Sequence, residues 1–130
     1  MKNQESLITN SVYLMPHEQA TVDFLLRHGY MVELIPRSKV AGVHTADILL
    51  DGVPFEIKSP TGRKRWTITR NLKRARKQSK YIVLDLRRIC RDEVLCIREA
   101  KSYLMNSRVI ERVMVITKER KILDFHKEKM

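Results

Sequence analysis

The dipeptide Asp51-Gly52 separates two short apolar runs, residues 45–50 and 53–57, and it constrains the fold more than any other feature. Asp-Gly between two such runs is typical of a two-residue type I′ turn, in which both central residues adopt positive φ. The two runs are therefore expected to form an antiparallel hairpin. Because a two-residue loop fixes the register of both strands, the cross-strand pairs follow from this turn.

The register of this hairpin places three charged side chains on one face. Counting outward from Leu50 and Val53, Asp47 is opposite Glu56, and alternation puts Lys58 on the face of Glu56. Directly opposed side chains have Cβ atoms about 4.5–5.5 Å apart, so two carboxylates placed there repel each other. A divalent cation between them removes that repulsion, because hard cations bind carboxylate oxygens. The alternative is a surface hairpin with a salt bridge. The opposite face is apolar and is expected to enter the core: Ile48, Leu50, Phe55 and Ile57.

The other segments alternate between helical and extended patterns. Helices are expected over residues 16–28, 67–79 and 92–106, and further strands over residues 30–35 and 81–86. Residues 109–116 and 121–125 favour a final strand pair, or a short helix and a strand, while residues 1–15 form a loop or an irregular helix. The resulting αβββαβ order, followed by a helix and one or two strands, is typical of an α/β fold with a central mixed β-sheet flanked by helices. A length of 130 residues fits a single domain, 1–130.

Glu18 adds a fourth charged residue to this set. On the first expected helix, Glu18 is followed by Val22, Leu25 and Leu26 at spacings of 4, 7 and 8 residues. These spacings share one helical face, so Glu18 is expected on the stripe that faces the sheet. A carboxylate that faces inward is unfavourable unless it is paired or bound to a metal. The alternative role is in the first turn, where the helix dipole favours an acidic side chain.

Every charged residue between positions 58 and 80 is basic, and this segment carries nearly all of the formal net charge of +11. A cluster of one sign attracts polyanions, and nucleic acid is the commonest of these. The alternatives are a solvated helix face and a patch for anionic membranes. Trp66, within this segment, either stacks on an unpaired base or anchors the basic helix in the core.

Signals for export or metal binding elsewhere in the chain are weak. No apolar run approaches the roughly 18 residues that a membrane span needs, and residues 1–10 lack the apolar core of a signal peptide. The two cysteines match no zinc pattern and suggest no oxidising compartment. The protein is therefore expected to act in the cytoplasm without a membrane partner. The histidines show no ligand spacing and are expected to be solvated or structural: His17, His28, His44 and His126.

The hairpin sequence also resembles a known family signature. The run Ala-Asp-Ile-Leu-Leu-Asp-Gly-Val-Pro-Phe-Glu-Ile-Lys-Ser-Pro, from Ala46 to Pro60, is similar to the D…ExK motif of PD-(D/E)XK nucleases, with Ala46 where the family name has proline. The upstream glutamate in a helix, the Gly-Tyr strand and the basic helix ending in Gln-Ser are similar to the C-terminal tRNA-nuclease domain of CdiA-type contact-dependent inhibition toxins and its standalone relatives. The resemblance covers residues 18–85. It implies a restriction-endonuclease-like core.

This resemblance implies a metal-dependent endonuclease that hydrolyses phosphodiester bonds, and it suggests a role for each candidate residue. Asp47 and Glu56 would bind Mg²⁺ or Mn²⁺ together with the carbonyl of Ile57, and Glu18 would bind the metal or its water. Lys58 would orient or activate the attacking water and offset the charge that grows on the phosphate. The nucleic acid would contact a group of mostly basic residues: Arg63, Lys64, Arg65, Trp66, Arg70, Asn71, Lys73, Arg74, Lys77 and Gln78.

Three interpretations of the function remain open. The first, slightly preferred, is a nuclease that cleaves RNA similar to tRNA. The second is a DNA nuclease of the restriction or resolvase kind, and the third is a catalytically silent nucleic-acid-binding module that keeps the fold. The paired carboxylates argue against a silent module, because a protein that only binds phosphates has no need of two acids beside them. The toxin resemblance also implies an immunity or regulatory protein as a partner.

Overall fold

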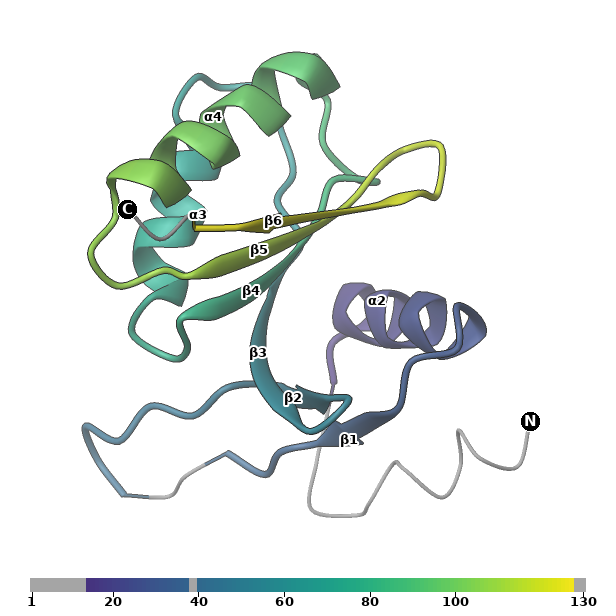
Figure 1. Ribbon diagram of the computed structural model, residues 1–130. Coiled ribbons are helices and arrows are strands. Elements are labelled where there is room, and N and C mark those ends of the chain that lie inside the picture. The colour runs from purple at the N-terminus through teal and green to yellow at the C-terminus, as the bar shows by residue number, and fades with distance from the viewer. Residues whose placement is uncertain (1–13, 38–39, 128–130) are drawn as a thin grey trace.

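A computed structural model describes residues 14–37 and 40–127 and shows a six-stranded mixed β-sheet with helices on both faces (Figure 1). The elements in chain order are α2 (Pro16–Arg27), β1 (Val32–Leu34), β2 (Ile48–Leu50), β3 (Val53–Lys58), α3 (Thr67–Ala75), β4 (Tyr81–Asp85), α4 (Glu93–Asn106), β5 (Arg112–Ile116) and β6 (Ile122–His126). The expected α/β class and the αβββαβ order are confirmed. Of the loop or irregular helix expected over residues 1–15, positions 1–13 lie outside the described residues.

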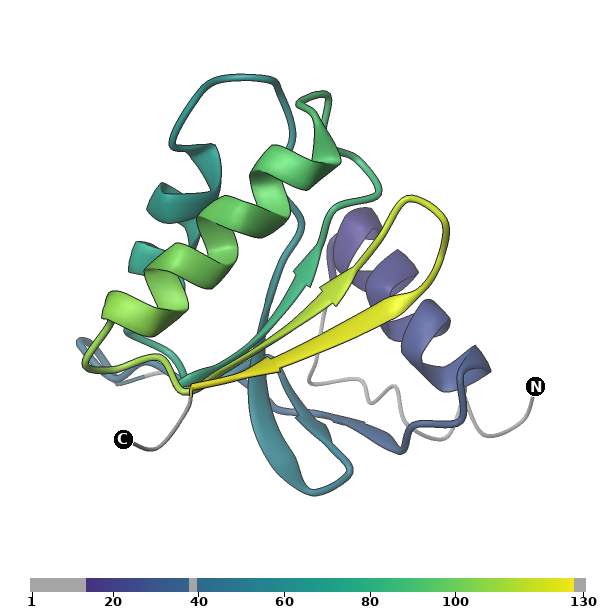
Figure 2. The ribbon, with the colours of Figure 1, turned by 45° about the horizontal axis from the view of Figure 1, so that its top comes forward.

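The strands lie in the sheet in the same order as in the chain, from β1 to β6. The first three strands are antiparallel neighbours, β3, β4 and β5 run parallel, and β6 returns antiparallel to β5. Parallel neighbours need crossover connections, and α3 and α4 supply them. These two helices pack against each other on one face of the sheet, whereas α2 covers the other face (Figure 1, Figure 2).

Two apolar cores lie on the two faces of the sheet. In the central strand β4, Ile82 and Leu84 belong to the core beneath α3 and α4, while Val83 belongs to the core beneath α2. A strand buried on both faces explains the continuous apolar character of β4. The apolar face expected for the hairpin is buried in the core of α2: Ile48, Leu50, Phe55 and Ile57.

The turn between β2 and β3 has the expected geometry. Asp51 has a φ of 48° and Gly52 a φ of 83°, as a type I′ turn requires. The expected register is also confirmed, with Ile48 opposite Phe55. Asp47 stands one residue before β2, and its backbone N–H donates a hydrogen bond of 3.1 Å to the carbonyl of Phe55. The local sequence thus places the acidic residues at the open end of the hairpin.

The helices begin where local signals predict, but one ends early. The side chain of Asp92 accepts hydrogen bonds from the first turn of α4, as expected of a helix cap. The basic helix α3 ends at Ala75 rather than at residue 79, because residues 76–78 form a turn in which the N–H of Lys77 bonds the carbonyl of Arg74. The hydroxyl of Ser79 then donates to the carbonyl of Pro54. No helix in the described part of the chain is long and apolar enough to cross a membrane.

The C-terminal residues form the strand pair that was one of two expected alternatives. β5 and β6 pair in antiparallel register along their full length, with Val113 opposite Phe125. The short helix considered for residues 109–116 is absent, because Val113 and Val115 belong to one core and Met114 and Ile116 to the other. Such alternation between two buried faces requires an extended strand.

Candidate active site

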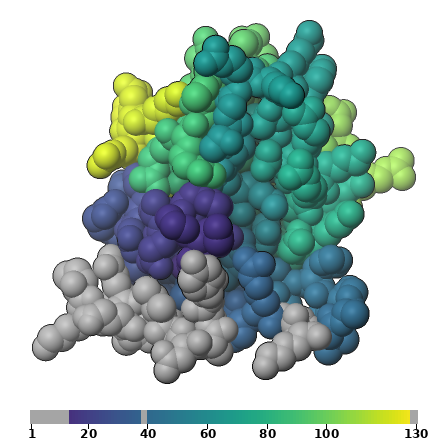
Figure 3. All heavy atoms as spheres, turned by 180° about the vertical axis from the view of Figure 1, so that it is seen from behind, coloured from purple at the N-terminus to yellow at the C-terminus, as the bar shows by residue number. Residues whose placement is uncertain are grey.

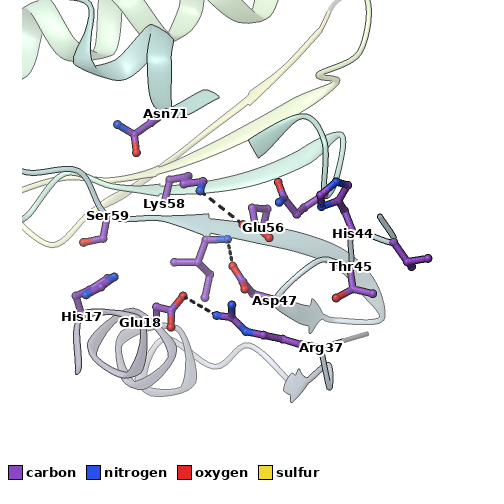
Figure 4. Close-up of a pocket in the computed structure, with 13 residues that line it drawn as sticks. His17, Glu18, Arg37, His44, Thr45, Asp47, Glu56, Lys58, Ser59 and Asn71 are labelled. Atoms are coloured by element: carbon purple, nitrogen blue, oxygen red, sulfur yellow. Dashed lines mark hydrogen bonds and ion pairs between the residues drawn. The ribbon is translucent and has the colours of Figure 1, made fainter. Parts of the chain in front are cut away.

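A polar pocket of about 500 Å³ opens where β3, the start of α2 and α3 approach one another. Its lining residues are His17, Glu18, Arg37, Val43, His44, Thr45, Asp47, Glu56, Ile57, Lys58, Ser59, Asn71 and Gln78. Figure 4 shows Glu18 reaching the pocket from α2, Asn71 from the helix on the opposite side, and Glu56 and Lys58 from β3 between them. Seen from behind, the start of α2 and the segments that follow β3 reach one face of the molecule (Figure 3). The four residues expected to carry chemistry thus line one pocket.

Asp47 and Glu56 form the acidic centre of this pocket. The Oδ2 of Asp47 accepts a hydrogen bond of 2.8 Å from the backbone N–H of Ile57, which holds this carboxylate against β3. Glu56 is only 6% exposed, and its Oε1 has no hydrogen-bond partner among the described residues. The Oε2 of Glu56 lies 3.8 Å from the Nζ of Lys58. The hairpin therefore brings Asp47, Glu56 and Lys58 close together in the pocket.

Burial and mutual repulsion give the two carboxyl groups unusual acidities. Burial, and then the charge and hydrogen bond of Asp47, raise the pKa of Glu56 to about 8, and the ammonium of Lys58 offsets this only in part. Burial also raises the pKa of Asp47, although the hydrogen bond from the N–H of Ile57 opposes the shift. One of the two carboxyl groups therefore holds a proton at neutral pH, as expected of two acids that share a site.

Glu18 uses its two carboxylate oxygens for different contacts. Its Oε1 accepts a hydrogen bond of 2.9 Å from the backbone N–H of Met15, which satisfies a free donor at the start of α2. Its Oε2 lies 3.8 Å from the guanidinium of Arg37, whose side chain is largely exposed. The two roles considered for Glu18, an inward-facing acid and a first-turn acid, are thus combined in one side chain.

The expected metal ligands are not gathered into a preformed cluster. Among the residues at positions 14–37 and 40–127, no three Asp, Glu, His or Cys side chains converge closely enough to hold a metal ion. Glu18 is turned toward Arg37, so the acidic pair Asp47 and Glu56 remains. This pair fits a divalent cation, because two adjacent carboxylates, one with an unpaired buried oxygen, are the hard ligands that Mg²⁺ and Mn²⁺ take.

Two amide side chains lie beside the acidic pair. Asn71, on α3, donates through its Nδ2 to the carbonyl of Thr67 at 2.8 Å, and in Figure 4 its oxygen points toward the pocket. Gln78 follows α3, and its Oε1 is buried without a partner among the described residues. Both residues were expected to contact nucleic acid from the basic helix, and the structure places them in the lining of the pocket. Unpaired acceptor oxygens in a polar pocket suit a hydroxyl group or water of a ligand.

Several lining residues were not anticipated from the sequence. His17 and His44 were expected to be solvated or structural, and both also line the pocket. For His17 a signal existed, since it directly precedes Glu18 in the first turn of α2. Arg37 and His44 belong to the long connection between β1 and β2, which has no periodic pattern that could place them.

The sequence and the fold both match proteins that are already known. A family model described as the contact-dependent growth inhibition CdiA C-terminal domain matches residues 44–122, more than half of the chain. The chain belongs to this family. A chain of the CdiA-CT/CdiI toxin and immunity complex from Burkholderia pseudomallei is similar at a TM-score of 0.69, over 92% of this chain and 97% of that chain. Its sequence identity is 18%, so this likeness shows a shared fold. No curated protein matches the chain.

The match to the CdiA C-terminal domain family covers most of the pocket. It includes Asp47, Glu56 and Lys58, together with α3, and it ends at the start of β6. Helix α2 and Glu18 lie outside the matched residues. The sequence resemblance to CdiA-type C-terminal domains is thereby confirmed over residues 44–122.

The basic residues of this CdiA C-terminal domain are divided between two surfaces beside α3. A groove of about 490 Å³ shares Asn71 with the pocket and is lined by four of them: Arg63, Lys64, Arg70 and Arg74. Arg65 and Trp66 line a separate hollow beside α4. Trp66 is 53% exposed, which excludes the core anchor considered for it. Lys73 and Lys77 are exposed but line neither surface.

A buried ion pair holds α2 of the CdiA C-terminal domain against the sheet. Asp85, at the end of β4, accepts a hydrogen bond of 2.6 Å from the hydroxyl of Thr21 on α2. The guanidinium of Arg87 donates to the same carboxylate oxygen at 2.8 Å and to the carbonyl of Ala20 at 3.1 Å. Burial alone would raise the pKa of Asp85, but the hydrogen bonds from Arg87 and Thr21 outweigh it and lower that pKa. These contacts fix the helix that carries Glu18.

Proposed function

We propose that this CdiA C-terminal domain is a metal-dependent endonuclease of the PD-(D/E)XK type that hydrolyses phosphodiester bonds. The observation that carries the proposal is the buried acidic pair Asp47 and Glu56 with Lys58 beside it, in a pocket that continues into a basic groove. Two acids that repel each other are unfavourable in a protein that only binds a polyanion. The same pair is suited to an ion that a phosphodiester substrate also contacts.

Each side chain of the pocket has a distinct task in this proposal. Asp47 and Glu56 would hold Mg²⁺ or Mn²⁺ through their carboxylates, with the carbonyl of Ile57 as a further oxygen. The bound ion polarises the phosphate and lowers the pKa of a water molecule. Lys58 presents its ammonium beside Glu56, where it orients the attacking water and offsets the negative charge that grows on the phosphate. Glu18, held by Met15 and Arg37, accepts a hydrogen bond from a water near the acidic pair.

We infer that RNA with a tRNA-like fold is preferred over DNA as the substrate. Asn71 and Gln78 line the pocket and carry amide oxygens that can accept hydrogen bonds, and the ribose 2′-hydroxyl is a donor that RNA has and DNA lacks. Arg70 and Arg74 are four residues apart on α3 and both line the groove, so they can follow a phosphate backbone. Cleavage of DNA is the second candidate, because these arginines would bind the phosphates that both nucleic acids share.

We further propose that the activity is toxic and that a dedicated immunity protein blocks it. The protein of similar fold comes from a toxin and immunity complex. The net charge of +11 favours a partner that is acidic. Production of the domain alone in bacteria should stop growth, and Glu56→Gln should restore it.

A cleavage assay with three substrates tests the proposal. Folded tRNA, supercoiled plasmid and a single-stranded oligonucleotide are incubated with the domain in Mg²⁺, Mn²⁺ or EDTA. We expect tRNA to be cut fastest, EDTA to abolish cleavage, and Glu56→Gln to be inactive. The matched control is Glu33→Gln, an exposed acid on β1 outside the pocket, which should retain activity. Equal cleavage in EDTA and Mg²⁺ would contradict the metal, and binding without cleavage would identify a silent module.

A further inference from the structure

A second hollow lies along α4, beside the start of α3. It has a volume of about 420 Å³, and none of its lining residues lines the pocket of Asp47 and Glu56. Trp66 precedes α3 here and is 53% exposed, although an indole gains more from burial than most side chains do. Its φ of 68° is a left-handed conformation that bulky residues rarely adopt. An exposed tryptophan held in a strained backbone indicates a binding surface.

Positive charge surrounds this indole. The guanidinium carbon of Arg65 lies 4.9 Å from the centre of the Trp66 ring. Arg98, on α4, is exposed and forms no ion pair with the described residues. The acid that lines the hollow, Glu99, is 8% exposed and is already paired with Arg91 at 2.5 Å. The hollow therefore offers an exposed indole, with Arg65 over its ring, and two guanidinium groups, those of Arg65 and Arg98, that form no ion pair with the described residues. Its carboxylate is already paired and is not free to repel an anion.

We propose that this hollow is a second nucleic-acid site, in which an unpaired base stacks on Trp66 and the flanking phosphates bind Arg65 and Arg98. Every base has a flat π face, so stacking on an indole requires no particular sequence. Phosphates are the anions that guanidinium groups bind with short, charge-assisted hydrogen bonds. The choice of nucleic acid as the ligand rests on the proposed nuclease function, whereas the site itself rests on Trp66 and its neighbours.

The path between the two surfaces favours a nucleic acid over an acidic protein. Arg63 and Lys64 line the groove that joins the pocket, and the next two residues, Arg65 and Trp66, line the hollow. A strand that leaves the groove across this loop therefore meets basic residues along its whole path. The regular spacing of charge on a phosphate backbone matches such a continuous line, whereas a protein presents its acids at separate points.

The second site positions the substrate and takes no part in the chemistry. Because it shares no residue with the acidic pocket, its loss should weaken the binding of long substrates and leave kcat unchanged. A substrate too short to reach from the pocket to Trp66 should not depend on it. The site also favours nucleic acids with unpaired bases, because a base inside a duplex is already stacked on its neighbours.

Trp66 is the only tryptophan in the chain, so its fluorescence reports on this hollow alone. The full chain carrying Glu56→Gln is titrated in EDTA, which prevents cleavage, with single-stranded oligouridylate of about 12 nucleotides, within the usual range of single-strand site sizes. We expect the oligonucleotide to quench the indole fluorescence. A blunt duplex of the same length should quench it much less, because its bases are paired and stacked.

Substitutions in the same background separate stacking from charge, with a labelled oligonucleotide as the probe. Trp66→Ala should weaken binding about tenfold, and Trp66→Phe less, because a phenyl ring keeps a π face. Arg98→Gln should reduce the slope of log affinity against log salt by about 0.7. Arg108→Gln removes an exposed arginine that lines neither the hollow nor the groove, and it should change neither quantity. Thermal melting confirms that each variant folds.

Three outcomes would overturn the second site. Binding of the oligonucleotide with unchanged fluorescence would show that it binds elsewhere, and no binding at all would remove the site altogether. Quenching by polyglutamate as strong as that by oligouridylate would contradict a nucleic-acid ligand. The nuclease proposal is tested separately by hydrolysis of bis(p-nitrophenyl) phosphate in Mn²⁺, because this small phosphodiester cannot reach Trp66. Either proposal can therefore fail without the other.

Discussion

Asp85 and Glu56 are both buried carboxyl groups on neighbouring strands, β4 and β3, and their pKa values are shifted in opposite directions. Asp85 is 2% exposed and receives hydrogen bonds from Thr21 and Arg87, so its pKa lies below the usual value. Glu56 is 6% exposed, with one unpaired oxygen and Asp47 beside it, so its pKa rises to about 8. Similar burial therefore has opposite consequences, because the partners of the two groups differ.

This difference distinguishes an acid that stabilises the fold, Asp85, from the acid that would bind the metal ion in the proposed function, Glu56. The protein satisfies Asp85 with its own donors, and the contacts join α2 to β4. It leaves Glu56 unsatisfied, which lowers stability, and such groups gather at functional sites. Substitutions at these two positions should therefore affect different properties of the protein.

Substitution of Glu56 should give the largest effect, and the effect should fall on activity. Glu56→Gln should lower the rate of tRNA cleavage by at least about 100-fold, the scale of losing one electrostatic contributor in an active site. The free energy of unfolding should stay the same or rise, because glutamine, unlike Glu56, need not take up a proton when the chain folds at neutral pH. Single-turnover cleavage and urea unfolding measure the two quantities. If the Glu56→Gln protein were unfolded in buffer, Glu56 would be needed for stability, as Asp85 is, and the comparison would fail.

Substitution of Asp85 should instead act on stability. Asp85→Asn should lower the free energy of unfolding by about 2 kcal/mol, less than for a fully buried pair because the Arg87 side chain is 20% exposed. Cleavage per folded molecule should persist, because Asp85 does not line the pocket. Asp124→Asn, at a more exposed ion pair with Arg112, is the control and should cost at most about 1 kcal/mol in urea unfolding. Loss of cleavage by fully folded Asp85→Asn would contradict a purely stabilising role for Asp85.

In the metal-free protein, pH should act on the two acids in opposite directions. Glu56 has a pKa of about 8 in the folded state against an ordinary value of 4.5, so the folded state keeps a proton that the unfolded state releases. The free energy of unfolding should therefore fall as the pH rises from about 5 to about 8, by at most about 1.4 kcal/mol per pH unit. Asp85 has a lowered pKa, so its contribution is present above its ordinary value of 3.8 and is lost as the pH falls through the folded pKa.

Urea unfolding in EDTA across this pH range measures both contributions. Glu56→Gln should flatten the decline between about pH 5 and about pH 8 and leave the loss at acid pH unchanged. Asp85→Asn should reduce the loss at acid pH alone. A decline that survives in Glu56→Gln would assign the retained proton to Asp47, whose pKa is also raised.

The smallest effect should come from Gln78, which resembles Glu56 in its unpaired oxygen but carries no charge. Gln78→Leu should raise KM for RNA about fivefold, because one neutral hydrogen bond contributes about 1 kcal/mol. Cleavage of DNA, which lacks the 2′-hydroxyl, should not change. KM for RNA and DNA oligonucleotides of one sequence measures the effect, with Gln19→Leu as a control outside the pocket. Equal losses on RNA and DNA would remove Gln78 from recognition of the sugar.

The hairpin and its acidic face could be predicted because they depend on residues close together in the chain. The Asp51-Gly52 turn fixes the register, and alternation along β3 then places Glu56 and Lys58 together. The cap at Asp92 and the apolar run of β4 are equally local signals. The fold class follows from the order of such elements, so it too was within reach of the sequence.

Contacts between distant segments could not be predicted from these local patterns. The bond between Thr21 and Asp85 joins positions 64 residues apart, and neither residue differs in type from many that are solvated. The position of Arg37 depends on an irregular connection that only the folded chain defines. Trp66 suited either a core or a surface, and only the folded chain shows that it is exposed.

The order of the strands has a consequence for when the pocket becomes competent. Each strand pairs with the one that precedes it in the chain, so the sheet can grow by addition at one edge. All the lining residues of the pocket lie between His17 and Gln78, and they are therefore in place in the chain before β4 begins. The strands β4, which pairs with β3, and β5, which pairs with β4, come later in the chain. The side chains that the proposed function uses are therefore all in the chain before the strands that complete the sheet.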